Sequence, residues 1–286
     1  MELKTLEREQ PEIQKPGVTD SKPGSVILTL FLSEMIGTAL LLLLGLSLVI
    51  FMYGSRSPIA EIIPSLGTRR LISGFIFGSI GASIALSRVG KESGAHINPV
   101  VTIGFRLMGK LDLRATLVYI AGQLAGAVIG CLPLLIWGSM GKSIAYGATL
   151  PGPGYPLSAV FLGEVFTTYT MIILLGFFLA YRKIRPYTPA LFPPLYSLLS
   201  WLEAAISGTS TNPARSFGPS LISGQWEGWW IYWAGPITGM FLAVTTLSFL
   251  SKKIETAKLY HFDSNQDRIF RRKPKASPES KGWVAE

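Results

Sequence analysis

Hydrophobic residues along this chain come in long blocks that short polar segments separate. Most blocks reach or approach the roughly 20 residues that a helix needs to cross a bilayer. They predict membrane-spanning helices at residues 26–51, 71–89, 113–137, 157–181, 187–206 and 229–250. The fifth block has the weakest pattern, because Pro189, Pro193 and Pro194 lie in its first half. Six crossings bring both ends of the chain to the same side of the membrane.

The polar segments outside these blocks divide the chain into parts. Both ends are rich in charged residues, Pro and Ser, a composition that predicts disorder. A stretch rich in Gly and Pro at 138–156 predicts a loop between two halves. The predicted parts are a disordered end at 1–24, one membrane domain at 25–251 with halves at about 25–137 and 157–251, and a disordered basic end at 252–286.

An Asn-Pro pair occurs twice, each time after a short polar run that contains glycine. The two boxes are Asn98-Pro99-Val100, called the first box, and Asn212-Pro213-Ala214, called the second box. Asn is a favoured helix N-cap and Pro is favoured at the first helical position, so each box predicts a helix start. The segments 98–110 and 212–223 are too short to cross a bilayer. We therefore expect two re-entrant half-helices.

The two halves repeat one another. Glu34 lies in the first predicted span and Glu164 in the fourth, and each half continues through two more spans with a box between them. Because three spans per half is an odd number, the second half enters from the opposite face of the membrane, as in an inverted repeat. The half-helix N-termini then meet near the midplane. Their partial positive charges repel cations, while the amides of Asn98 and Asn212 donate to a passing oxygen.

Composition and charge support a membrane protein. Of the 286 residues, 49% are hydrophobic and 15% are charged, and the mean hydropathy is +0.40, which excludes an ordinary soluble domain. Lys and Arg are more frequent on the side of the two ends, so both termini are predicted to be cytoplasmic and the 138–156 loop extracellular. The formal net charge of +9 indicates attraction to anionic membrane lipid, and nucleic acid is not an expected partner. A single cysteine and two histidines provide no metal constellation.

These features resemble the major intrinsic protein family, the aquaporins and glycerol facilitators. The resemblance covers about residues 26–250 and rests on both boxes, on the lead-in Gly94-Ala95-His96, on Arg215-Ser216 and on the two intraspan glutamates. It implies an all-α membrane fold of six transmembrane helices plus two re-entrant half-helices, a homotetramer with one pore per subunit, and no cofactor, metal or catalytic residue. Val100 departs from the pattern, because the family usually has Ala there.

The resemblance also implies roles for single residues. Glu34 and Glu164 face the bundle interior and accept hydrogen bonds from the backbone of the re-entrant loops. Arg215 lies at membrane depth, where ionisable residues are functional candidates, and forms part of the narrowest filter. His96 lies two residues before Asn98 and either lines the cytoplasmic vestibule or is a structural imidazole.

The filter positions are counted from the boxes without gaps. The count gives Gly78, Ser200, Thr209 and Arg215. This set resembles the wide, polar filter of plant nodulin-26-like channels of the silicic acid type. A shift of one residue in the second span would instead place Phe77 there, and Ser216, Tyr232 and Trp233 resemble the water-channel pattern.

We therefore expect a passive channel, in a cell membrane, for water and small uncharged hydroxylated solutes such as metalloid acids or glycerol. Ions and protons are excluded. One alternative is a strictly water-selective aquaporin. A second is an ion-coupled secondary transporter, which shares inverted repeats and broken helices but needs a titratable cluster at the midplane. A membrane enzyme is the third, and the sequence contains no nucleophile pair or cofactor motif that would support it.

Overall fold

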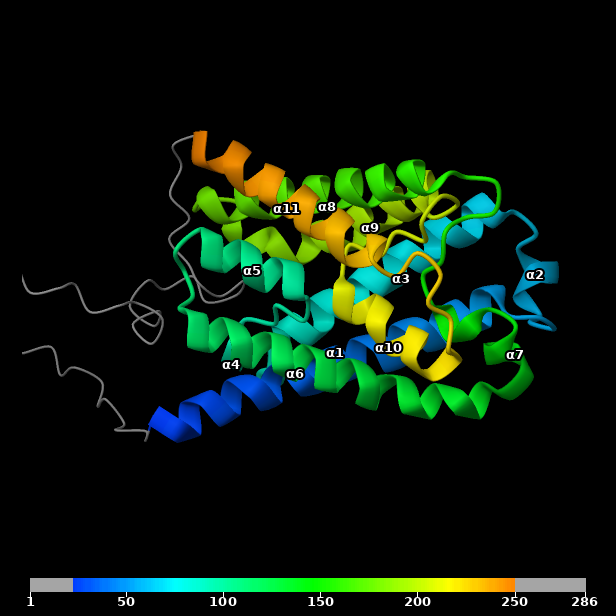
Figure 1. Cartoon of the computed structure of the whole chain (residues 1–286), viewed down its shortest axis with the longest axis horizontal. Helices are drawn as coiled ribbons and strands as arrows, with labels where there is room; N and C mark the ends of the chain where they lie inside the picture. Colours follow the sequence, from blue (N-terminus) through cyan, green and yellow to red (C-terminus); the bar gives the residue numbers. More distant parts are fainter. Residues whose placement is uncertain (1–22, 250–286) are drawn as a thin grey trace, which may run out of the picture.

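The computed structural model describes residues 23–249, and helices are the only regular structure in that range (Figure 1). The long helices are α1 (Pro23–Tyr53), α3 (Leu66–Leu86), α6 (Leu113–Cys131), α8 (Leu157–Ala180), α9 (Thr188–Glu203) and α11 (Ile231–Phe249). The shorter elements are α2 (Ile59–Ile62), α4 (Arg88–Ser93), α5 (Pro99–Leu107), η1 (Leu132–Trp137), α7 (Gly138–Lys142), η2 (Ala145–Gly147), η3 (Arg185–Tyr187) and α10 (Pro213–Ser223). The predicted disorder of the two ends lies outside the described residues, except that α1 already begins at Pro23.

Five helical segments within residues 23–249 are long and apolar enough to cross a membrane: α1, α3, α6 with its continuation through η1 and α7, α8 and α11. The fifth predicted span is α9, which has 16 residues and is shorter than its 187–206 block. Pro193 and Pro194 lie inside α9, where a proline removes a backbone donor. The second span begins earlier than predicted, because Ser65 caps α3 by accepting from the Thr68 amide at 3.2 Å.

The membrane helices pack in pairs, α1 with α6, α3 with α9, and α8 with α11 (Figure 1). Glycines make each close approach: Gly126 of α6 lies against the backbone of Met35, Gly78 of α3 against that of Phe192, and Gly239 of α11 against that of Val165. A Cβ atom at these positions would meet backbone, which cannot move aside. The small residues of these helices therefore set the spacing of the bundle.

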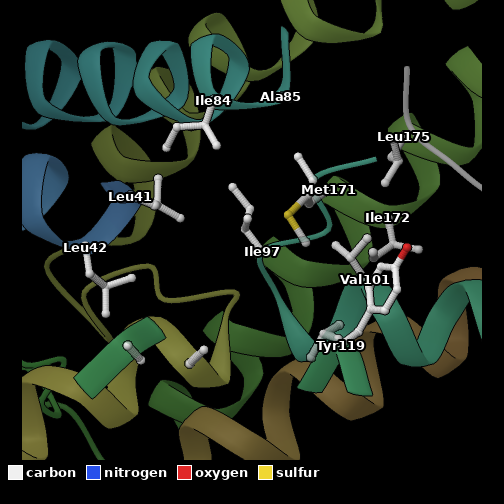
Figure 2. Close-up of a cluster of buried hydrophobic side chains, with 14 of the residues drawn as sticks. Leu41, Leu42, Ile84, Ala85, Ile97, Val101, Tyr119, Met171, Ile172 and Leu175 are labelled. Atoms are coloured by element: carbon white, nitrogen blue, oxygen red, sulfur yellow. The ribbon is translucent and has the colours of Figure 1, made fainter. Parts of the chain in front are cut away.

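The two short helices α5 and α10 lie inside the bundle. Figure 1 shows α5 (teal) and α10 (yellow) running from the middle of the molecule toward opposite ends. Around the start of α5, Ile97 lies between Leu41 of α1, Ile84 of α3 and Met171 of α8 (Figure 2). Apolar side chains from three long helices thus surround the start of α5.

The loop predicted at 138–156 is partly folded and partly buried. It contains α7 and η2, and Tyr146, Gly147 and Thr149 are buried. The Thr149 hydroxyl donates to the hydroxyl of Ser216 at 2.7 Å. The loop therefore contacts the second re-entrant segment, α10.

Candidate functional site

Both boxes begin a helix. α5 starts at Pro99 and α10 at Pro213, each directly after an asparagine whose side chain caps it. Asn98 Oδ1 accepts from the Val100 amide at 2.9 Å, and Asn212 Oδ1 accepts from the Ala214 amide at 3.0 Å. The two half-helix N-termini therefore point toward one another across the centre of the fold, which concentrates their unpaired amides and positive dipole ends there.

The two caps are also bonded to each other's loops. Asn98 Nδ2 donates to the carbonyl oxygen of Thr211 at 2.9 Å, and Asn212 Nδ2 donates to that of Ile97 at 2.9 Å. An amide nitrogen carries two hydrogens, so one donor on each asparagine remains for another partner. Both asparagines line a small inner cavity of about 60 Å³, room for a few water molecules.

Two fully buried glutamates hold the loops that precede the boxes. Glu34 accepts from the hydroxyl of Ser93 (2.6 Å), the amides of His96 (2.9 Å) and Ile97 (2.7 Å) and Nε2 of Gln123 (2.7 Å). Glu164 accepts from the hydroxyl of Ser207 (2.5 Å) and the amides of Ser210 (2.7 Å) and Thr211 (2.9 Å). Each carboxylate thereby satisfies backbone donors that no helix or strand satisfies.

Arg215 is the third residue of α10 and lines a second cavity of about 270 Å³, which we call the outer cavity. Its Nη1 donates to the carbonyl oxygen of Gly147 at 2.7 Å, which ties it to the folded loop after α7. Ser200 and Thr209 line the same cavity. The structure thus brings together three of the four residues that the sequence assigned to the filter.

Gly78 is the fourth, and it does not line the outer cavity. A Cβ atom at Gly78 would lie 2.6 Å from the carbonyl oxygen of Phe192, so this position faces α9 and borders only the inner cavity. Phe77 lines both cavities, with its ring packed on Gly45 of α1 and 6.3 Å from the ring of Tyr196. The count without gaps assumed a fixed connection from the second span to Asn98. That connection folds as the short helix α4, so the count alone does not decide between Gly78 and Phe77.

His96 combines the two interpretations that the sequence left open. Its ring packs between Phe105 and Tyr119, with centroids at 4.6 and 4.9 Å, and Nδ1 lies 3.2 Å from the Thr102 hydroxyl. Only 2% of His96 is exposed, yet it lines the inner cavity. His96 is therefore a packed imidazole that also borders the inner cavity.

Sequence reasoning missed three polar residues at or beside the two cavities. Tyr196 lines both cavities, and its hydroxyl lies 2.9 Å from that of Thr211. Gln123 donates to Glu34, and Glu203 accepts from the hydroxyl of Thr209 at 2.7 Å. A signal was available for two of them. Glu203 is a carboxylate in a predicted span, like Glu34, and Tyr196 precedes Ser200 by one helical turn.

Comparison with known proteins agrees with this geometry. The model of the major intrinsic protein family matches residues 21–246. The chain is 37% identical over 169 residues to a probable aquaporin TIP4-2 of Oryza sativa, covering 58% of this chain and 64% of that protein. It is 33% identical over 227 residues to aquaporin A of Dictyostelium discoideum, covering 74% and 75%. The match thus spans just under two thirds of the rice protein and three quarters of the amoebal one.

A solved structure is similar in fold. The aquaglyceroporin from Plasmodium falciparum superposes with a TM-score of 0.62 at 20% identity, covering 77% of this chain and 94% of that one. At this identity the likeness concerns the fold alone. The family match extends over nearly all of residues 23–249 and includes both capped half-helices and the glutamates that hold their loops. This chain belongs to the major intrinsic protein family.

Proposed function

We propose that this protein is a passive membrane channel for water and small uncharged hydroxylated solutes, and that it excludes ions and protons. One observation carries the proposal. The N-termini of α5 and α10 face each other beside the small inner cavity, and both box asparagines keep an amide hydrogen for a permeating oxygen.

The exclusion of cations follows from the charges around this path. Each half-helix N-terminus contributes about half a positive charge, and Arg215 adds a full charge at the outer cavity. A cation entering the path meets these charges after losing its water shell. A water molecule at the midplane donates to neither asparagine amide, because both are donors. Its orientation then disfavours the chain of hydrogen bonds that carries a proton.

The outer cavity supports solutes larger than water. Ser200 and Thr209 carry hydroxyl groups, and Arg215 carries N–H donors, so a solute that sheds its hydration regains hydrogen bonds there. Polyols and metalloid acids have the matching chemistry. A strictly water-selective channel is the second candidate function, and one observation favours it. The inner cavity has a volume of only about 60 Å³, against about 270 Å³ for the outer cavity, and Phe77, Tyr196 and Ser210 border both.

The experiment uses the full chain reconstituted in proteoliposomes, with protein-free liposomes as control. Stopped-flow light scattering measures the permeabilities for water, glycerol, urea and boric acid, and an internal pH dye measures proton flux. We expect water and at least one solute to exceed the control, without proton flux above it and without an effect of a protonophore. Water permeability equal to the control overturns the proposal. Flux of water alone selects the second candidate function.

We also propose a homotetramer with both termini cytoplasmic. The family resemblance supports the assembly, and the Lys and Arg distribution supports the orientation. Cross-linking in mild detergent is expected to reach a tetramer. Protease protection in sealed vesicles is expected to place both ends on one side. A largest species of two subunits contradicts the assembly.

A further inference from the structure

We propose that Glu203 is a positioning residue that sets the hydrogen-bond role of Thr209 and so helps select the solute. This inference rests on the proposed function, because it names how the outer cavity discriminates among the solutes that the channel passes. Glu203 does not line either cavity and acts through Thr209.

The geometry around Glu203 is closely fitted. Glu203 is the last residue of α9, and 4% of it is exposed. Its Oε2 accepts from Thr209 Oγ1 at 2.7 Å. Its other oxygen lies against Gly163 of α8, where a Cβ atom would collide with it. The absence of a side chain at Gly163 thus leaves room for this carboxyl group beside α8.

The inverted repeat shows that the Glu203–Thr209 bond is not needed to build the loop. The position that matches Thr209 in the first half is Ala95, with φ of +49° against +52° for Thr209. Both amides donate to the serine two residues earlier at 3.1 Å. Ala95 has no hydroxyl and adopts the same backbone. The backbone of the second loop therefore does not depend on the Glu203–Thr209 bond, and we assign this bond a role in the function of the loop.

The bond determines what Thr209 offers to the cavity. A hydroxyl has one hydrogen and two lone pairs, and Oε2 of Glu203 accepts that hydrogen from Thr209. When the hydrogen of Thr209 is committed to Glu203, the hydroxyl can only accept from a solute. Arg215 lines the same cavity and only donates. A solute that carries O–H or N–H donors beside an acceptor oxygen matches both. This is the chemistry of polyols, boric acid and urea.

The test measures the ratio of urea to water permeability, and of boric acid to water, for the reconstituted full chain. Glu203→Leu removes the acceptor, and Thr209→Val removes the hydroxyl at constant volume. Each is expected to lower both ratios by about three- to tenfold, the equivalent of one net hydrogen bond. The double variant is expected to match Thr209→Val alone, because the two residues act as one unit. Glu203→Gln keeps an acceptor oxygen and is expected to retain the wild-type ratios.

The controls separate this inference from folding and from the proposed function. Glu227→Leu removes an exposed carboxylate and is expected to change no ratio. If Glu203→Leu does not fold, Glu203→Gln and Thr209→Val still decide, since the first must keep the ratios and the second must lower them. Unchanged ratios in Thr209→Val, additive losses in the double variant, or a Glu203→Gln that behaves like Glu203→Leu each overturn the inference.

Two results for the wild-type channel are also decisive. If it conducts water and none of these solutes, the positioning role is overturned while the water channel stands. If it conducts neither water nor solute, the proposed function itself fails.

Discussion

The loop before α5 and the loop before α10 have nearly the same backbone and very different surroundings. Their left-handed residues match in pairs: Gly94 (φ +86°) with Gly208 (+85°), Ala95 (+49°) with Thr209 (+52°), and Ile97 (+42°) with Thr211 (+52°). In each loop a serine hydroxyl and two amides donate to one buried glutamate. Such a backbone is unfavourable for residues with a side chain, so each glutamate holds strained geometry in place.

The side chains around these loops differ between the halves. Gln123 follows Gly122 and donates to Glu34, whereas Pro236 follows Gly235 and has no donor to offer Glu164. The third residue after the capping asparagine is Val101 in the first half and Arg215 in the second. The comparison teaches that the contacts shared by the two halves hold the loops in place, whereas Arg215 and the Glu203–Thr209 bond have no counterpart in the first half.

Removing either glutamate is expected to have the largest effect. Glu34→Leu and Glu164→Leu each leave at least three buried donors without a partner, at about 1–3 kcal/mol apiece. The sum is comparable to the whole stability of a typical domain. We expect neither variant to yield monodisperse protein in mild detergent, with Glu227→Leu as the exposed control. Loss in one variant only would show that the two halves are not equivalent scaffolds.

Arg215→Val gives the second half the residue that the first half has at the matching position. We expect the channel to fold and to conduct water, because Val101 is compatible with the same backbone. Proton flux is expected to rise on the order of tenfold, equivalent to about 1.4 kcal/mol of lost barrier. An internal pH dye in proteoliposomes measures this rise. Proton flux at the wild-type level would assign exclusion to the half-helices alone.

Neighbouring residues on α3 separate packing from selection. Gly78→Ala puts a Cβ atom 2.6 Å from a backbone oxygen of α9, and it is expected to destabilise the protein by about 1–3 kcal/mol with little change in solute selectivity. Phe77→Ala removes a ring that borders both cavities, and it is expected to raise glycerol permeability several-fold relative to water. Thermal unfolding and stopped-flow measurements distinguish the two. If Gly78→Ala instead changes selectivity at unchanged stability, the filter position is Gly78.

These two residues also show how far the sequence predicts the molecule. The six spans and both half-helix starts were predictable, because a bilayer requires long apolar helices and because Asn98 and Asn212 cap their helices with local bonds. The choice between Gly78 and Phe77 was not, since it depends on how the α3–α5 connection folds. Nor was the contact from Arg215 to Gly147, which joins two segments far apart in the chain.

The smallest effect on transport is expected at the point where the boxes differ. Val100 is completely buried and occupies the position that Ala214 has in the second half. Val100→Ala removes two buried methyl groups, which destabilises by roughly 1–2 kcal/mol after a small gain in helix propensity. The cap from Asn98 to this residue uses the backbone amide and is unaffected. We therefore expect a lower midpoint of thermal unfolding and unchanged permeabilities for water and glycerol. A changed solute ratio would mean that Val100 shapes the path itself, and that the first half also takes part in selection.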